Sequence, residues 1–125
     1  MGIAAFIPIS IELEATGLVW HPAIGDEVLN REEQRKVSIL VDPQGLTPKE
    51  LRENFVWLPT VEQLVTQLEA RQALIYHAGM TAQMSYEAVV RTVFGVVEAQ
   101  AASLREVFGL ALRDILMKDS HQAIH

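Results

Sequence analysis

The residues whose types and spacing are best suited to chemistry are two histidines near the carboxyl end. His121 and His125 are four residues apart, a spacing at which two imidazoles on one helical face can share a metal ion, and Asp119 is close by. The segment that contains them is polar, and polar chain ends fray unless other contacts hold them. We therefore interpret residues 119–125 as a frayed tail and expect no metal site.

The remaining titratable residues match no catalytic motif. The sequence contains none of the common nucleotide-binding, zinc-protease and esterase signatures, namely Gly-x-Gly-x-x-Gly, Gly-x-x-x-x-Gly-Lys, His-Glu-x-x-His and Gly-x-Ser-x-Gly. Adjacent acids at 26–27 and 32–33 lie among other charges in expected loops, whereas catalytic acid pairs need burial to separate their pKa values. His21, before a proline, and His77, at an expected helix end, suit structural roles. The sequence favours a protein without catalytic activity and predicts no cofactor.

One group of aromatic residues could line a pocket. Tyr76 and His77 lie on one side of the expected Gly79 loop and Tyr86 on the other, while Trp57 is on a short connection between two expected helices. Small-molecule sites are usually apolar clefts with a few polar groups. A pocket near these aromatic residues is therefore the alternative to their use in a core.

Composition restricts the classes of partner. The chain has 125 residues, half of them apolar and 21% charged, which suits one domain with its own core. Its net charge of −6 disfavours nucleic acid and anionic membrane as partners. Without cysteine there is no disulfide, thiolate nucleophile or zinc ribbon, so a cytoplasmic location is expected. Charged residues interrupt every apolar run before the roughly 20 residues that span a bilayer, and we identify no signal peptide.

The amino-terminal part has the pattern of an antiparallel sheet, which we place at residues 6–42. Apolar and polar residues alternate from 7 to 14, as in a half-buried strand. Pro8 cannot donate to a strand ladder, so either this strand lies at a sheet edge or Pro8 lies ahead of the paired region. Leu18-Val19-Trp20 is predicted as a short second strand.

A hairpin is expected in the second part of this sheet. The apolar runs 28–29 and 37–41 flank a charged connection at 30–36. Asp42-Pro43-Gln44-Gly45 then has the composition of a type I turn, which ends the sheet.

Two short stretches each carry a capping box. Thr47 with Glu50, and Thr60 with Gln63, have the spacing at which two side chains satisfy the first free N–H groups of a helix. Pro48 at the first helical position and Gly79 as an end signal agree with this interpretation. The two helices are predicted at residues 48–55 and 61–77.

A long helix is expected at 86–118, because no proline interrupts it and apolar residues recur in heptad steps of four and three. Its length of roughly 50 Å exceeds the diameter of about 36 Å expected for a sphere of this size. Either the molecule is elongated, or a second copy covers the excess. The predicted oligomer interface comprises Val90, Phe94, Val97, Glu98, Ala101, Leu104, Arg105, Phe108, Ala111 and Ile115.

The tripeptide Val-Phe-Gly occurs twice in this segment, at 93–95 and 107–109. A glycine inside a helix costs about 1 kcal/mol relative to alanine, so something must offset two of them. Antiparallel pairing of two copies would place each glycine against a phenylalanine ring of the partner. Alternatively, the apolar stripe covers this chain's own sheet, and the glycines mark places where its own backbone approaches closely.

The sequence thus predicts one α+β domain at 1–118, with an amino-terminal antiparallel sheet of three or four strands, two capped helices and a long final helix. We expect a cytoplasmic, non-catalytic assembly or adaptor protein that forms a homo-oligomer, most simply a dimer. The alternative is a small-molecule-binding domain or an unfamiliar enzyme.

Overall fold

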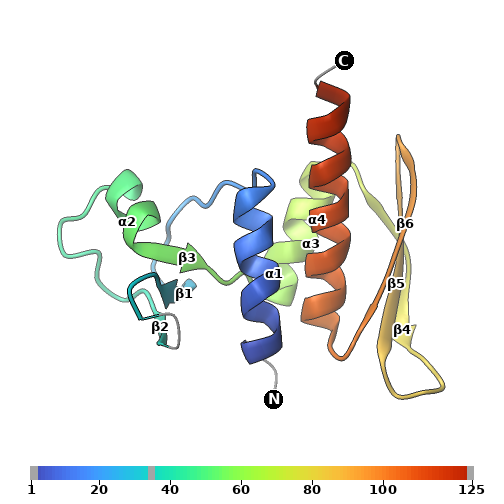
Figure 1. Cartoon of the computed structure of the whole chain (residues 1–125), viewed down its shortest axis with the longest axis horizontal. Helices are drawn as coiled ribbons and strands as arrows, with labels where there is room; N and C mark the ends of the chain where they lie inside the picture. The colour runs from blue at the N-terminus through green and yellow to red at the C-terminus, as the bar shows by residue number, and fades with distance from the viewer. Residues whose placement is uncertain (1–2, 34–35, 124–125) are drawn as a thin grey trace.

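The computed structural model describes residues 3–33 and 36–123, with side chains up to residue 119, and its fold is α+β (Figure 1). The described elements, in chain order, are α1 (Ile3–Ala15), β1 (Glu27–Asn30), β2 (Val37–Ile39), α2 (Pro48–Asn54), β3 (Phe55–Trp57), α3 (Val61–Ala70), β4 (Leu74–Met80), β5 (Tyr86–Thr92), β6 (Gly95–Ala101) and α4 (Leu104–Ala123).

The first sheet is small and antiparallel, with the strand order β2-β1-β3. The predicted hairpin is confirmed, because β1 and β2 pair on either side of residues 31–36. The third strand of this sheet is β3, which follows α2 in the chain, and the amino-terminal residues provide no strand to it. Leu18-Val19-Trp20 forms no strand, so the predicted sheet at 6–42 is correct only in its second part.

The turn that ends this hairpin lies one residue later than predicted. Leu46 N–H donates to Pro43 O at 2.9 Å, and Gln44 and Gly45 between them have φ values of 53° and 77°. Two consecutive positive φ values do not fit the type I turn expected at 42–45. Glycine adopts such a value at little cost, which explains why the turn centres on Gly45.

The predicted strand at 7–14 is wrong, because these residues belong to helix α1. Its buried residues are Phe6, Ile9, Ser10 and Leu13, which share one helical face through steps of three, one and three. Pro8 lies inside the helix on its exposed side, where it removes one backbone hydrogen bond. The alternating isoleucines fit the period of a strand. The serine on the apolar face interrupts the helical pattern of apolar residues, so the helix was not predicted.

Both capping boxes are confirmed. Thr47 and Thr60 each accept a hydrogen bond from the backbone N–H three residues later, and the side chains of Glu50 and Gln63 each return one. α3, however, ends at Ala70 and not at residue 77. The chain reverses at Gln72, whose φ is 58°, and continues as β4.

The predicted helix at 86–118 is also wrong. Residues 86–101 form the hairpin β5–β6, which joins β4 in a second antiparallel sheet of order β4-β5-β6, and helix α4 begins only at Leu104. Valines at 89, 90, 93, 96 and 97 favour strands, because their branched side chains pack well on a pleated surface. α4 continues to Ala123, so most of the expected tail at 119–125 has a helical backbone.

The main core lies where α1, α3, α4 and one face of the second sheet meet. α4 packs on β5 and β6 on one side and on α1 on the other (Figure 1). The fully buried residues here include Phe6, Leu64, Val90, Val107 and Leu112. A smaller cluster of Trp20, Val28, Leu40 and Leu51 holds the first sheet and α2 together. Trp57 packs against both clusters, so β3 connects them.

One ion-pair group joins α1 to α4 at the surface. Arg113 donates to Glu12 at 2.8 Å and to the adjacent Asp114. Partial burial opposes the charge of the guanidinium, but the hydrogen bonds to Glu12 and Asp114 outweigh it and raise the pKa of Arg113. Arg113 therefore stays cationic and its link to Glu12 adds to the helix contact.

Candidate functional site

The aromatic pocket expected near Tyr76, His77 and Tyr86 does not form. Tyr76 and His77 are exposed on β4, where Arg91 lies over the ring of Tyr76 at 5.2 Å. Tyr86 packs against the main core. The fourth member of the predicted pocket, Trp57, lies on the other sheet. These residues therefore do not share a site.

Trp57 instead lines a cavity of about 270 Å³ on the side of α1 that faces the first sheet. This volume is close to the lower end of the range for small-molecule sites. Apolar side chains provide most of its walls, with a few polar groups among them. Its lining residues are Ser10, Glu14, Leu18, Val19, Trp20, Arg31, Arg52 and Trp57.

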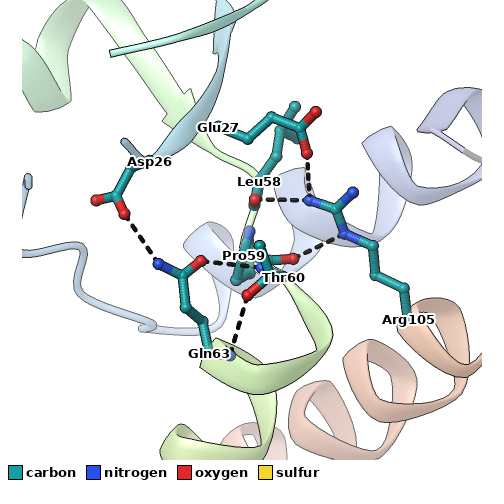
Figure 2. A network of polar contacts seen from close by, with 7 residues as sticks. All are labelled: Asp26, Glu27, Leu58, Pro59, Thr60, Gln63 and Arg105. Atoms are coloured by element: carbon teal, nitrogen blue, oxygen red, sulfur yellow. Dashed lines mark hydrogen bonds and ion pairs between the residues drawn. The ribbon is translucent and has the colours of Figure 1, made fainter. Parts of the chain in front are cut away.

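Trp20 is oriented by a buried carboxylate. Its indole N–H donates to Asp26 Oδ2 at 2.8 Å, and the same oxygen accepts from Ala23 N–H at 3.0 Å. The other oxygen of Asp26 accepts from Gln63 Nε2 at 2.9 Å, as Figure 2 shows. Asp26 thus accepts three hydrogen bonds, as a buried charge requires, and fixes one wall of the cavity.

Arg105 forms the second half of this network and holds β3 in place. Its guanidinium donates to the carbonyls of Leu58 and Pro59 at 2.7 and 2.8 Å and pairs with Glu27 at 2.7 Å (Figure 2). It also lies over the ring of Phe6, 4.5 Å from the centroid. Because these contacts reach the residues directly after β3, they position Trp57 in the cavity wall. Arg105 was expected at an oligomer interface, and its role here is within the chain.

The two arginines of the cavity differ in how their charges are balanced. Arg31 pairs with Glu14 at 2.5 Å and donates to the carbonyl of Arg52. Arg52 donates from Nη1 to the carbonyl of Trp20 at 3.0 Å. Within the described residues no carboxylate is near enough to Arg52 to form an ion pair. One positive charge in the cavity wall is therefore not neutralised.

Two side chains of the cavity wall have buried polar atoms without a partner. Among the described residues, the hydroxyl of Ser10 and the indole N–H of Trp57 are the buried side-chain groups that make no hydrogen bond. Ser10 is only 2% exposed. Leaving such a group unsatisfied costs about 1–3 kcal/mol, so each needs an explanation. Both residues line this cavity, and Trp57 also lines a second pocket with Gln63 and Thr66, but the two unpaired atoms themselves are buried beneath the surface.

The predicted interface residues are divided among separate elements. Val90 and Val97 are buried on the inner face of the second sheet, and Phe108, Ala111 and Ile115 are buried in α4. Ala101 and Leu104 pack partly against the same core. Phe94 is in the β5–β6 turn and Glu98 is exposed on β6. The seam that was to bind a second copy is mainly this chain's own core.

The histidines give no site within the described residues. His21 is exposed, and His77 pairs with Glu87 at 3.3 Å. His121 is in α4 with no described side chain, and His125 is outside the described residues. No three metal-binding side chains come together in the part of the chain that was described.

Of the residues that line the cavity, the sequence interpretation named only Trp57 as a pocket residue, and the polar residues that it missed include Ser10, Arg31 and Arg52. Ser10 could have been found if residues 6–13 had been interpreted as a helix, because it then lies on the apolar face with Ile9 and Leu13. No sequence pattern marks Arg31 or Arg52, since they come together with Ser10 only through tertiary contacts.

Comparison of the chain with protein-family models, with curated proteins and with solved structures finds no match. Across residues 3–33 and 36–123, no helix combines the length and the apolar character needed to cross a membrane. Function must therefore be inferred from the geometry of the chain itself.

Proposed function

We propose that this chain is a non-catalytic binding module for a small organic molecule, held in the cavity between α1 and the first sheet. The observation that carries the proposal is the cavity itself, with a volume of about 270 Å³, mostly apolar walls and a few polar groups. A small organic molecule can bury its apolar surface there while those polar groups fix its orientation.

The walls of the cavity also support this function. Leu18, Trp20 and Trp57 provide apolar and aromatic surface, as small-molecule sites usually do, while a few polar groups fix orientation. The two indole N–H groups differ in their hydrogen bonding. Trp20 donates to Asp26, whereas the buried N–H of Trp57 has no acceptor among the described residues.

Binding fits the lining residues better than catalysis. Ser10 has no hydrogen-bonded base to activate its hydroxyl, and the lining residues include no histidine, lysine or cysteine. Glu14, the single acid of the lining, is paired with Arg31. A nucleophile, its base and a third orienting group are therefore not assembled here.

The test is to fill the cavity and measure the loss of ligands. Ligand-observed NMR of the wild type against a fragment library should give a set of binders. Val19→Trp, which adds a ring at the cavity wall, should abolish the binding of some of them. Val41→Trp is the matched control, because Val41 is exposed outside this cavity and gains the same ring. The proposal fails if every binder is retained by both variants.

A second candidate function is self-association through the face of the second sheet that points away from α4. Leu74, Tyr76 and Val96 are exposed apolar residues on β4 and β6. In the β5–β6 ladder, Arg91 lies opposite Val96 toward one end of this face. Glu98 lies two residues after Val96 along β6. A two-fold axis would place the arginine of one copy near the glutamate of the other, which favours a homodimer.

Sedimentation equilibrium tests this second candidate. The wild type should have the mass of a dimer, and Val96→Glu should have the mass of a monomer because it buries a charge in the contact. Val41→Glu, an exposed valine of the first sheet's loop, should remain a dimer. A wild-type monomer at high concentration would remove the candidate.

A further inference from the structure

The charge distribution of the cavity indicates what kind of molecule it accepts, and this inference rests on the proposed function. Arg31 is balanced by Glu14, whereas Arg52 has no acidic partner among the described residues. Arg52 lies in the last turn of α2, where a cation also stabilises the helix dipole. Its charge is therefore held at the cavity wall by the fold and is available to an anion.

The guanidinium of Arg52 is only partly engaged by the protein. Its hydrogen bond to the Trp20 carbonyl uses Nη1. The described chain provides no acceptor for Nε or Nη2. Two adjacent donors in one plane match the two oxygens of a carboxylate, the geometry in which arginine binds most strongly.

The rest of the cavity limits the ligand to a single negative charge and an apolar body. Because Arg31 and Glu14 balance each other, Arg52 leaves the lining with one net positive charge, which matches a carboxylate better than a dianionic phosphate. A volume of about 270 Å³ holds roughly ten non-hydrogen atoms. Two tryptophans and a leucine on the walls favour an aromatic or branched aliphatic body.

We propose that the cavity binds small monocarboxylic acids with an aromatic or branched aliphatic body. The carboxylate pairs with Arg52, and the apolar body packs against Leu18, Trp20 and Trp57.

Intrinsic fluorescence can test this directly, because the chain has two tryptophans and both line the cavity. The probes are 4-phenylbutyrate, its neutral amide 4-phenylbutanamide and the cation 4-phenylbutylamine, which have the same apolar body. The acid should bind at least about tenfold more tightly than the amide, since a hydrogen bond to a charged group contributes that much. The amine should bind most weakly.

Variants at Arg52 identify the source of the preference. Arg52→Gln should remove the preference for the acid over the amide, and Arg52→Lys should retain part of it. Arg71→Gln, which removes an arginine that is hydrogen-bonded to Gln67 at the end of α3 and is not part of the cavity lining, should leave it unchanged. If Arg52→Gln is poorly folded, Arg52→Lys still gives the comparison.

The outcomes separate this inference from the proposed function. Equal binding of acid and amide, or tighter binding of the amine, overturns the charge assignment and leaves the cavity as a binding site. If none of the three probes changes the fluorescence, the carboxylate inference is overturned. The proposed function then falls only if no fragment is lost on Val19→Trp either.

Discussion

Val93-Phe94-Gly95 and Val107-Phe108-Gly109 are identical tripeptides that adopt opposite structures. In the first, Val93 and Phe94 form the turn of the β5–β6 hairpin and are 82% and 46% exposed, and Gly95 begins β6. The second lies in α4, with Val107 0% and Phe108 5% exposed. The three side chains therefore do not determine their own backbone conformation, and the cause lies in the residues around them.

The first copy is made into a turn by its neighbours. Thr92 Oγ1 accepts from the N–H of Phe94 at 3.1 Å and donates to the carbonyl of Gly95 at 3.2 Å, which closes the loop locally. Gly95 has a φ of 126°, a conformation that other residues rarely adopt. The β-branched residues on either side favour the strands that the turn joins.

The second copy follows a helix start and meets another helix. Ser103 Oγ accepts from Glu106 N–H at 3.2 Å and donates to its carboxylate at 2.7 Å, so α4 begins with a capped turn. A Cβ atom on Gly109 would lie 2.8 Å from Ile9 Cγ2 and 2.9 Å from Phe6 Cε1. Glycine is needed here because α1 approaches so closely, which offsets its poor helix propensity.

Substitution of the phenylalanines should give the largest difference in stability between the two copies. Phe108→Ala should lower the free energy of unfolding by about 3–5 kcal/mol, because it leaves a cavity in the main core. Phe94→Ala should cost less than about 1 kcal/mol, since nearly half of that side chain is already exposed. Urea denaturation of both variants measures the difference, and equal losses would contradict the assignment of the two environments.

The two glycines should respond to alanine for different reasons. Gly109→Ala should cost about 1–3 kcal/mol of unfolding free energy through overpacking against Ile9 and Phe6, although alanine favours a helix. In an Ile9→Ala background the same substitution should cost clearly less, because one of the two contacts is removed. A double-mutant cycle gives the coupling energy between the two substitutions. A stabilising effect of Gly109→Ala would contradict the close approach of α1 to α4.

The smallest loss of stability is expected for a substitution in the β5–β6 hairpin. Gly95→Ala should cost about 1–2 kcal/mol through backbone strain alone, because no atom lies within 4 Å of the added methyl group. Gly79→Ala, in β4 without a positive φ, is the control and should be close to neutral. Thermal unfolding followed by circular dichroism is sufficient, and equal effects at the two sites would argue against the turn geometry.

Elements whose signals are local could be predicted from the sequence. The two capping boxes and the β1–β2 hairpin depend on contacts within a few residues, and their side chains act as expected. The two largest failures were at 7–14 and 86–118, where apolar residues fit two periods at once. Position 9 is apolar in a strand pattern and in a helical pattern, so periodicity alone could not choose between them.

The candidate site was predictable only in part, through Trp57. The sequence alternative of a small-molecule pocket named that residue, but placed it beside Tyr76 and His77 on what proved to be another sheet. Ser10, Arg31 and Arg52 come from α1, the end of the first hairpin and α2. Their proximity depends on how these elements pack, which no short-range pattern encodes.

By itself, the sequence determined the mixed α+β composition, the caps of two helices and the position of one hairpin, because each follows from hydrogen bonds between near neighbours. Only the tertiary structure decided whether Val-Phe-Gly became a turn or a helix, and which polar groups lost their partners at the cavity. The physical reason is that packing energies between distant segments exceed the local preferences of a few residues, so the choice is made where α1, α4 and the two sheets meet.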